Sequence, residues 1–393
     1  MADFELLTLN LAKMTIESTN SQNSTTPAIT YSECYAQVFS HRFPYRWTLK
    51  DANFTKDKGK VFSCFACGGG STMGYKLAGF DVIGCNEIDP KMIEAYKANH
   101  NPKYAFLEPI QTFKMREDLP QELYELDILD GSPPCSSFSM AGNREKDWGK
   151  DKVFREGQAM QVLDTLFFDF IDLAKKLQPK VVVAENVKGL LLGDAIQYVR
   201  QIYREFDFAG YYCQHWLLDA SKMGVPQRRE RVFFIALRKD LAKPFLKQVN
   251  LFDILPELNL QFNEPKILFE KVYHNYCDRE LTGAVLSVYN EAKKGETDLR
   301  YAAERLKGKQ DFFGYKLTYM DSIPLTIMGN DNVIIYGEKR YRNFDELCEC
   351  GSYPKDYDFS GNKPEYLIGM SVPPVVMANI SEQIYLQWLS KLK

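Results

Sequence analysis

The sequence predicts an α/β fold in which a mostly parallel sheet carries helices on both faces. Between residues 60 and 238, short apolar runs alternate with segments whose apolar residues recur at helical spacing. The stretch "CGGG" separates the first apolar run from the first helical segment, as in a strand–turn–helix unit. After about residue 243 the alternation stops. We therefore expect a sheet domain and a smaller, irregular second domain.

The apolar runs are predicted strands, and most of the segments between them are predicted helices. The strands are expected at residues 60–66, 81–87, 126–132, 180–187, 211–220 and 231–238. The helices are expected from the glycines to about residue 80 and at residues 90–100, 163–178, 194–206 and 375–391. Because strands that alternate with helices form βαβ units, ligands should bind at the carboxyl ends of these strands.

The ends of the predicted sheet domain have a different character. Residues 18–27, "STNSQNSTTP", are polar and aperiodic, which predicts a flexible segment. Residues 34–47 are rich in aromatic and basic side chains, and we expect them to form a helix packed on the core. Residues 244–345 carry charges of both signs without periodicity, which indicates strands and loops.

The composition is that of an ordinary globular protein. The chain has 393 residues, of which 45% are hydrophobic and 26% charged, enough for two domains. The net charge of −3 gives no overall basic field, so any nucleic acid must be bound by local patches. The first residues lack the pattern of a signal peptide, and no apolar run reaches the ~20 residues of a membrane span. We therefore expect no membrane contact and a cytoplasmic location.

The nine cysteines do not predict a disulfide framework, because their number is odd and the expected compartment is reducing. Cys64 and Cys67 form C-x-x-C, and Cys348 and Cys350 form C-x-C, so zinc is an alternative. However, Cys64 ends an apolar run, and the second pair lacks the spacing of a zinc ribbon. We expect buried thiols and no metal.

The glycine stretch and the next strand together indicate a cofactor site. Three consecutive glycines allow a ligand to approach the backbone closely. The following strand ends in Glu87, within roughly 20 residues, where a carboxylate commonly accepts hydrogen bonds from a ribose. The spacing differs from G-x-G-x-x-G, which favours a nucleoside cofactor without a pyrophosphate. The alternatives are an ordinary turn and an exposed strand-end carboxylate.

Three further motifs place reactive side chains at strand ends. In "SPPCSSFS", two prolines restrict the backbone before Cys135, which could present the thiol on a rigid ledge or bury it. In "VVVAENV", Glu185 ends an apolar strand, where a carboxyl group could hold or deliver a proton. In "QRRERV", Arg229 and Arg231 could bind carbonyl or anionic groups, or be solvated in a charged turn.

These motifs, in this order and followed by "YLIGMSVPPVVMANI", resemble the cytosine-5 DNA methyltransferase family. The resemblance covers about residues 60–240 and 365–393. It implies a Rossmann-like class I methyltransferase sheet, built from residues 58–243 and 365–393. Residues 244–364 then match the family's target-recognition domain and hinge, and residues 1–57 are a partly flexible N-terminal extension outside the resemblance.

The resemblance implies a mechanism for methyl transfer from S-adenosylmethionine to cytosine C5. Cys135 matches the nucleophile that attacks C6, and Glu185 matches the acid that engages N3 and the exocyclic amine. Arg231 matches the arginine near O2, and Arg229 supports the same pocket. Because the target atom lies inside a duplex, the base must be flipped out.

The family pattern also implies binding residues, which are retold here by their numbers in this chain. The cofactor S-adenosylmethionine, with S-adenosylhomocysteine as product, is expected to contact Phe65, Ala66, Gly69, Gly70, Glu87, Ile88, Pro134, Leu166, Ser371 and Val372. Double-stranded DNA is expected to contact Ser136, Arg144, Lys146 and Lys152, most of them in a catalytic loop at residues 140–157. Several positions depart from the family: Cys67 stands where glycine is usual, Ser136 where glutamine is usual, and Met370 within the usual G-N-S-V motif, while Pro109 sits where an acid would meet the adenine.

The resemblance leaves other functions open. A tRNA cytosine-5 methyltransferase uses the same frame, but a recognition domain of roughly 100 residues is long enough to read a DNA major groove. A non-catalytic DNA-binding homologue would have lost Cys135 or Glu185. We expect a monomer associated with the nucleoid, with a cognate restriction endonuclease as a possible partner.

Overall fold

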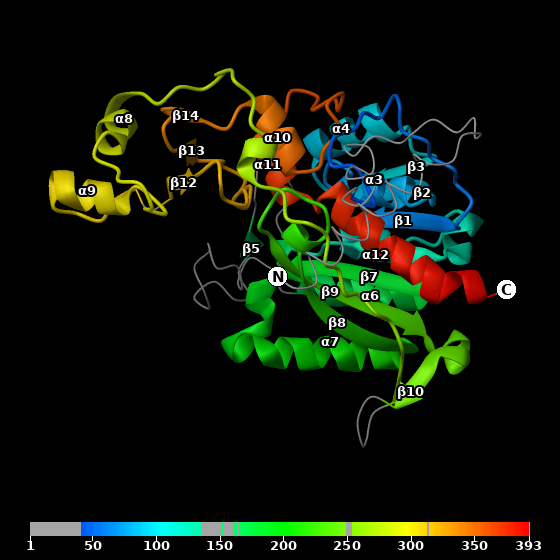
Figure 1. Ribbon diagram of the computed structural model, residues 1–393. Helices are drawn as coiled ribbons and strands as arrows, with labels where there is room; N and C mark the ends of the chain where they lie inside the picture. The colour runs from blue at the N-terminus through cyan, green and yellow to red at the C-terminus, as the bar shows by residue number, and fades with distance from the viewer. Residues whose placement is uncertain are drawn as a thin grey trace, which may run out of the picture. The chain divides into compact units, whose positions relative to one another are not determined.

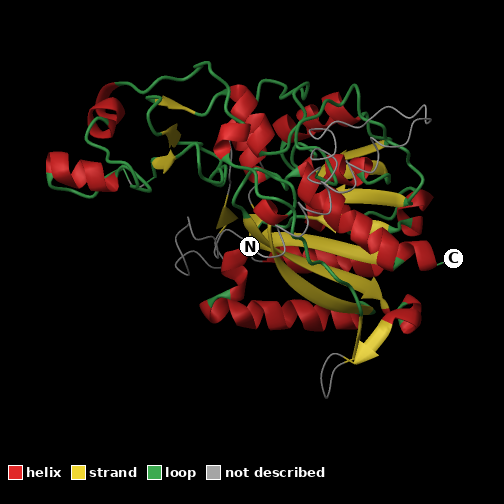
Figure 2. Cartoon of the chain, in the orientation of Figure 1, coloured by secondary structure: helices red, strands yellow, loops and turns green. Residues whose placement is uncertain are grey.

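A computed structural model describes residues 41–134, 151–152, 161–162, 165–248, 254–312 and 314–392. Its centre is a seven-stranded sheet with strand order β3-β2-β1-β4-β7-β9-β8 (Figures 1 and 2). The strands are β1 Lys60–Cys64, β2 Asp81–Glu87, β3 Tyr104–Leu107, β4 Ile128–Gly131, β7 Val181–Val187, β8 Tyr211–Asp219 and β9 Glu230–Arg238. The predicted fold class is therefore confirmed.

The direction of each strand decides which residues meet at one edge of the sheet. Strands β3, β2, β1, β4 and β7 are parallel, whereas β9 is antiparallel to β7, and β8 is antiparallel to β9. The amino end of β9 therefore lies beside the carboxyl end of β7, with Val187 opposite Arg231. We call this side, where β1, β2, β4 and β7 end, the catalytic edge, because the sequence predicts the catalytic residues there.

Helices cover both faces of the sheet, as predicted. One apolar core joins the sheet to α5, α6 and α7. A second core, on the opposite face, includes side chains of α3 and α12, which crosses the sheet in Figure 1. The helices are α3 Gly70–Leu77, α4 Pro90–His100, α5 Ile110–Phe113, α6 Leu166–Leu177, α7 Ile196–Phe208 and α12 Pro374–Gln387. The C-terminal helix thus returns to the sheet domain.

Helix α4 illustrates how local sequence sets an element boundary. The carboxylate of Asp89 accepts hydrogen bonds from the backbone N–H groups of Lys91 and Met92, and Pro90 occupies the first turn. The Asp89 carboxylate thus satisfies two of the free N–H groups at the start of the helix, and Pro90 has no N–H that needs a partner. The helix ends at Asn101, which has the left-handed backbone conformation common at helix ends.

Residues 244–364, which the family resemblance assigns to target recognition, are called the recognition region below. This region contains helices that the sequence did not predict. Its helices are α8 Gly283–Tyr289, α9 Arg300–Lys307 and α10 Phe344–Cys350, and its strands are β10 Leu246–Gln248, β11 Ile254–Pro256, β12 Lys316–Thr318, β13 Val333–Ile335 and β14 Arg340–Tyr341. Helix α11 Pro364–Met370 follows, and β5 Asp151–Lys152 pairs with β6 Gln161–Val162. The expectation of strands and loops was wrong for α8 and α9. Their few apolar residues are spaced at helical intervals within a polar sequence. They form a separate small core that includes Leu299, Ala302 and Ala303.

The predicted helix at residues 34–47 is also wrong for its described part. Residues 41–47 are irregular, and Pro44 removes a backbone donor there. His41 is 2.8 Å from Glu264, and the Trp47 indole donates to the Ser352 carbonyl at 2.9 Å. The segment is therefore held by polar contacts to distant parts of the chain.

The described cysteines are free thiols, and Cys64, Cys348 and Cys350 are buried as expected. Within the described ranges, no group of three or more histidine, cysteine, aspartate or glutamate side chains is arranged to hold a metal ion. None of the helices in these ranges is both long and apolar enough to cross a membrane.

Candidate active site

Glu185 and Arg231 form an ion pair at the catalytic edge. The Arg231 Nε lies 3.0 Å from Glu185 Oε1, and both side chains are mostly buried. Their strands position them, because Glu185 is near the carboxyl end of β7 and Arg231 is near the amino end of β9. The structure thus brings together two residues that the sequence assigned to one pocket, 46 positions apart. A carboxyl group beside a fixed cation suits recognition of a polar ring edge.

Asn186 connects this pair to the proline ledge. Its side-chain amide donates to the Pro133 carbonyl at 3.1 Å, and its Oδ1 accepts from the backbone N–H of Val187 at 2.9 Å. Asn186 is buried. The end of β7 therefore fixes the backbone two residues before Cys135. Cys135 itself lies outside the described residues, as do Ser136, Arg144 and Lys146, and the Lys152 side chain is also not described.

Arg229 makes structural contacts through its guanidinium group. The group donates to the carbonyls of Ile327, Gly369 and Ser371 at 3.3, 3.1 and 3.0 Å. Burial, together with the charge of Arg231, lowers the pKa of Arg229 to about 9. Arg229 thus joins the start of β9 to the recognition region and to the C-terminal motif. This geometry is that of a residue that supports the pocket through its neighbours.

Glu87 closes the glycine loop against the end of β2. Its Oε2 accepts from the Cys67 N–H at 2.7 Å, and its Oε1 accepts from the N–H groups of Ile88 and Asp89 at 2.8 and 2.9 Å. Burial raises the pKa of Glu87, and the three N–H groups oppose that rise. Each carboxylate oxygen has two lone pairs, so Oε2 keeps capacity for a ligand hydroxyl group.

The glycines of this loop are required by packing as well as by backbone conformation. A Cβ atom on Gly70 would lie 2.3 Å from the Val372 carbonyl and 2.8 Å from the Ser371 Cβ. Gly69 has φ +86°, and a Cβ there would lie 2.2 Å from the ring of His100. The predicted residues Ser371 and Val372 therefore do lie against the predicted glycine loop. The C-terminal motif acts as the outer wall of the loop.

The remaining predicted cofactor residues lie near the same loop or farther along the sheet. Phe65 has φ +52° and packs edge-on against Phe170 of α6, with ring centroids 6.3 Å apart. Ala66 is buried, Ile88 and Pro134 are half-buried, and Leu166 is buried at the start of α6. A half-buried aromatic ring, a carboxylate with spare acceptor capacity and a close-packed glycine turn fit an adenine nucleoside.

Asp130 is a buried carboxyl group that the sequence analysis missed. It lies at the end of β4, is 1% exposed, and accepts from Ser63 Oγ at 2.7 Å and from the Tyr75 hydroxyl at 3.2 Å. Burial raises the pKa of Asp130 to about 7, although hydroxyl groups donate to it. An aspartate between apolar residues in "DILDGS" was the available signal, because an acidic side chain is rare inside a buried strand.

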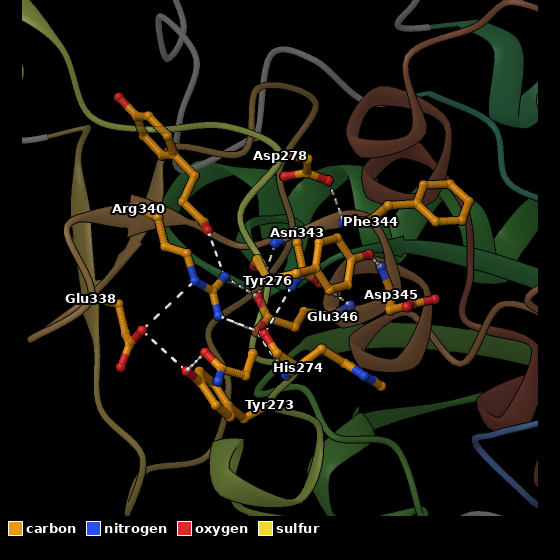
Figure 3. Close-up of polar contacts among 12 residues, drawn as sticks. Tyr273, His274, Tyr276, Asp278, Glu338, Arg340, Asn343, Phe344, Asp345 and Glu346 are labelled. Carbon is orange, nitrogen blue, oxygen red and sulfur yellow. Dashed lines mark hydrogen bonds and ion pairs between the residues drawn. The ribbon is translucent and has the colours of Figure 1, made fainter.

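Within the recognition region, a buried polar cluster fixes the segment around His274 to helix α10. Figure 3 shows Arg340 reaching Glu346, with Arg340 nitrogens 2.7 and 2.9 Å from the two carboxylate oxygens. Asn343 caps α10, and its amide donates to the carbonyls of His274 and Tyr276. The cluster thus anchors the chain around residue 274 to the strand and helix that follow β13.

Comparisons with known proteins show similarity to DNA methyltransferases. The chain is 38% identical to the Type II methyltransferase M.FnuDI of Fusobacterium nucleatum over 46% of this chain and 48% of that protein. It is 27% identical to the Type II methyltransferase M1.HphI of Haemophilus parahaemolyticus over 81% and 85%. The chain therefore spans only about half the length of its relative M.FnuDI.

Solved structures share the fold. A putative DNA modification methyltransferase encoded within an E. coli prophage matches with a TM-score of 0.58 and 19% identity, over 84% of this chain and 99% of that one. A DNMT2 mutant from Spodoptera frugiperda matches with a TM-score of 0.56 and 18% identity, over 83% and 99%. The model of the C-5 cytosine-specific DNA methylase family matches residues 59–386. The chain with this glycine loop and this Glu185–Arg231 pair belongs to the C-5 cytosine-specific DNA methylase family.

Proposed function

We propose that the protein transfers a methyl group from S-adenosylmethionine to C5 of a flipped-out cytosine in a specific duplex DNA sequence, through a covalent bond between Cys135 and C6. One observation carries the proposal. The Glu185–Arg231 pair lies on the strand end that also fixes the backbone of Pro133, two residues before Cys135. An acid and a cation are thus held at one edge of the sheet, and the described chain at that edge leads into the segment that contains Cys135.

The residues have complementary roles toward the cytosine ring. The Cys135 thiolate adds to C6, and the electrons of the C5–C6 double bond move toward N3 and O2. Glu185, after it takes up a proton from solvent, delivers that proton to N3, and Arg231 binds the electron-rich O2. When N3 returns its proton to Glu185, C5 becomes nucleophilic. S-adenosylmethionine, when bound, supplies the electrophilic methyl group. Loss of the C5 proton to solvent then breaks the sulfur–C6 bond and frees the Cys135 thiolate.

The chain's own residues also prepare the cofactor site. Glu87 would bind the ribose hydroxyls through the free lone pair of Oε2, and Phe65 would contact the adenine ring. Gly69 and Gly70 would lie along the methionine part. We also propose Pro134 and Leu166 as contacts and Arg229 as a support of the cytosine pocket. The loop that holds Ser136, Arg144, Lys146 and Lys152 would bind DNA.

A methylation assay with a covalent trap tests this mechanism. The wild-type protein should transfer labelled methyl groups to duplex DNA and form a denaturant-resistant complex with duplexes that contain 5-fluorocytosine, because fluorine cannot leave as a proton does. Cys135→Ser should reduce transfer to background and abolish the complex. Full activity of Cys135→Ser would contradict the covalent step, and labelling of tRNA instead of DNA would contradict the substrate.

The names of the relatives support a role in restriction–modification. M.FnuDI and M1.HphI are both named Type II methyltransferases. We propose that this protein likewise protects a sequence from a cognate endonuclease and acts as a monomer. Methylation mapping of DNA from cells that express it would identify the sequence. The mapped sites should then resist cleavage by an endonuclease of that specificity, and cleavage of fully methylated sites would contradict the role.

A further inference from the structure

Asp130 is a buried carboxyl group with no cationic partner in the described parts of the chain. The hydroxyl groups of Ser63 and Tyr75 donate to it at 2.7 and 3.2 Å, and the side chain of Ser71 is a further hydrogen-bond donor. Hydroxyl donors can stabilise a carboxylate but do not cancel its charge. A buried carboxyl group without a cation is costly when ionised, which suggests that its charge has a use.

The position of Asp130 places this charge between two parts of the proposed active site. Asp130 lies at the carboxyl end of β4, five residues before Cys135. Ser63 is opposite it on β1, two residues before Phe65 and the glycine loop. Tyr75 belongs to α3, the helix that the glycine loop begins. Asp130 therefore connects the cofactor loop to the strand that leads to the nucleophile.

The field of Asp130 also reaches neighbouring groups. Burial is the main cause that raises the pKa values of Asp130, Cys64, Tyr75 and Tyr96; the charge of Glu185 adds to the rise for Asp130, and the charge of Asp130 adds to the rise for the other three. Glu185 is paired with Arg231, and the thiol and two phenols stay protonated near neutral pH. Asp130 is thus the group in this set that can change its charge near neutrality without a cation beside it.

The two forms of the expected cofactor differ by one charge. S-adenosylmethionine carries a sulfonium cation, whereas S-adenosylhomocysteine has a neutral sulfur. In the proposed function the cofactor binds along the glycine loop and delivers its methyl group toward the end of β4, so the sulfur must come into this part of the site. A buried negative charge attracts the cation more strongly than it would in water. Its effect on the neutral product is much smaller.

Resting on the function proposed above, we propose that Asp130 is a selectivity residue that favours binding of the sulfonium cofactor over its neutral product. This preference would speed exchange of the spent cofactor after each methyl transfer. It requires no change in the chemistry at Cys135. It differs from a packing role, because packing would affect both forms of the cofactor equally.

Calorimetric titration with each form of the cofactor tests the proposal without measuring activity. Asp130→Asn keeps the shape and one acceptor oxygen but removes the charge. We expect the variant to bind S-adenosylmethionine about 10-fold more weakly, equivalent to ~1.4 kcal/mol, with less than a twofold change for S-adenosylhomocysteine. The control is Ser63→Ala, which removes one donor and leaves the charge, so the ratio of the two affinities should shift less.

Proton release provides a second readout in the wild-type protein. A sulfonium that binds near Asp130 favours its ionised form, so S-adenosylmethionine should release a fraction of a proton near pH 7, and Asp130→Asn should release less. Titrations in buffers of different ionisation enthalpy measure this difference. Equal weakening of both ligands, or proton release unchanged by the substitution, would overturn the inference. Failure of the wild-type protein to bind either ligand would instead overturn the proposed function and the inference with it.

Discussion

The recognition region and the catalytic edge differ in the partners of several buried carboxyl groups. In the recognition region, Glu346 is paired with Arg340, and Asp331 is paired with Arg342, all of them nearly fully buried. At the catalytic edge, Glu87 and Asp130 are bound by backbone N–H and hydroxyl groups, and no ion pair is recorded for either within the described ranges. The difference teaches that ion pairs fix the recognition region, whereas the catalytic edge pairs Glu185 with Arg231 but holds Glu87 and Asp130 by hydrogen bonds alone.

Removing one arginine of the recognition region should have the largest effect on stability. Arg342 Nε lies 2.9 Å from Asp331 Oδ2, and a second nitrogen of its guanidinium contacts the other carboxylate oxygen. Arg342→Met leaves Asp331 buried without a partner, which should cost ~3–5 kcal/mol in the free energy of unfolding. Urea denaturation measures the cost.

An exposed ion pair provides the control for that substitution. Lys103 and Glu122 lie 2.6 Å apart on the surface, where solvent screens the pair, so Lys103→Ala should leave the stability nearly unchanged. The double variant Arg342→Met/Asp331→Leu should recover part of the loss, because it removes the unpaired charge. A small effect of Arg342→Met would show that Asp331 is solvated, and the contrast between the regions would then fail.

Gly70→Ala tests whether the catalytic edge depends on close packing instead. The added Cβ would lie 2.3 Å from the backbone carbonyl of Val372, which cannot move without shifting the C-terminal motif. Overpacking of this kind costs ~1–3 kcal/mol, and we expect the upper part of that range. Gly314→Ala is the matched control in the recognition region, since a Cβ there meets no atom within 4 Å. Thermal unfolding of both variants measures the difference. Equal melting temperatures for Gly70→Ala and Gly314→Ala would contradict the close packing at Gly70.

Asp130→Asn should make stability less dependent on pH. Burial raises the pKa of Asp130 from its ordinary 3.8 to about 7, so the folded protein binds this proton more tightly than the unfolded chain. The wild-type protein therefore loses stability as pH rises through this interval, and the variant does not. Each tenfold change in proton affinity is worth ~1.4 kcal/mol, so the advantage of the variant should grow by about 2 kcal/mol between pH 5.5 and pH 8.

Urea denaturation at the two pH values measures this difference. A variant that is less stable than the wild-type protein by the same amount at both pH values would show that Asp130 acts only through its hydrogen bonds. A growing advantage would instead show that the wild-type chain keeps a destabilising charge at its proposed active site, as functional sites commonly do.

Local patterns explain why the catalytic edge could be predicted and parts of the rest could not. Apolar strands and a glycine turn place Glu87 and Glu185 at one edge, because parallel strands end on the same side, and Arg231 lies at that edge because antiparallel β9 starts there. The role of Arg229 depends on carbonyls about 140 residues later, such as that of Gly369, which no local pattern encodes. Asp130 was missed because one aspartate in a short strand does not reveal whether it is buried.

The recognition region was harder to predict for a related reason. Its small core is built from a few apolar residues within polar segments, so helices α8 and α9 have weak periodic signals. Its buried ion pairs join residues such as Asp331 and Arg342, whose charges in the sequence resemble those of exposed loops. Burial therefore depends on tertiary contacts that the charge pattern does not show.

Cys67 provides the test with the smallest expected effect on stability. It stands at a position where glycine is usual in this family. Its φ of +48° lies in the left-handed region, which costs a non-glycine residue ~1 kcal/mol or more, while its N–H donates to Glu87. Its thiol contacts the Met92 sulfur at 3.6 Å. Cys67→Ala loses that contact and keeps the strain, whereas Cys67→Gly loses the contact but relieves the strain. We expect the glycine variant to be more stable than the alanine variant by ~1 kcal/mol in urea denaturation. If the alanine variant were the more stable, the left-handed backbone at residue 67 would not destabilise the folded protein.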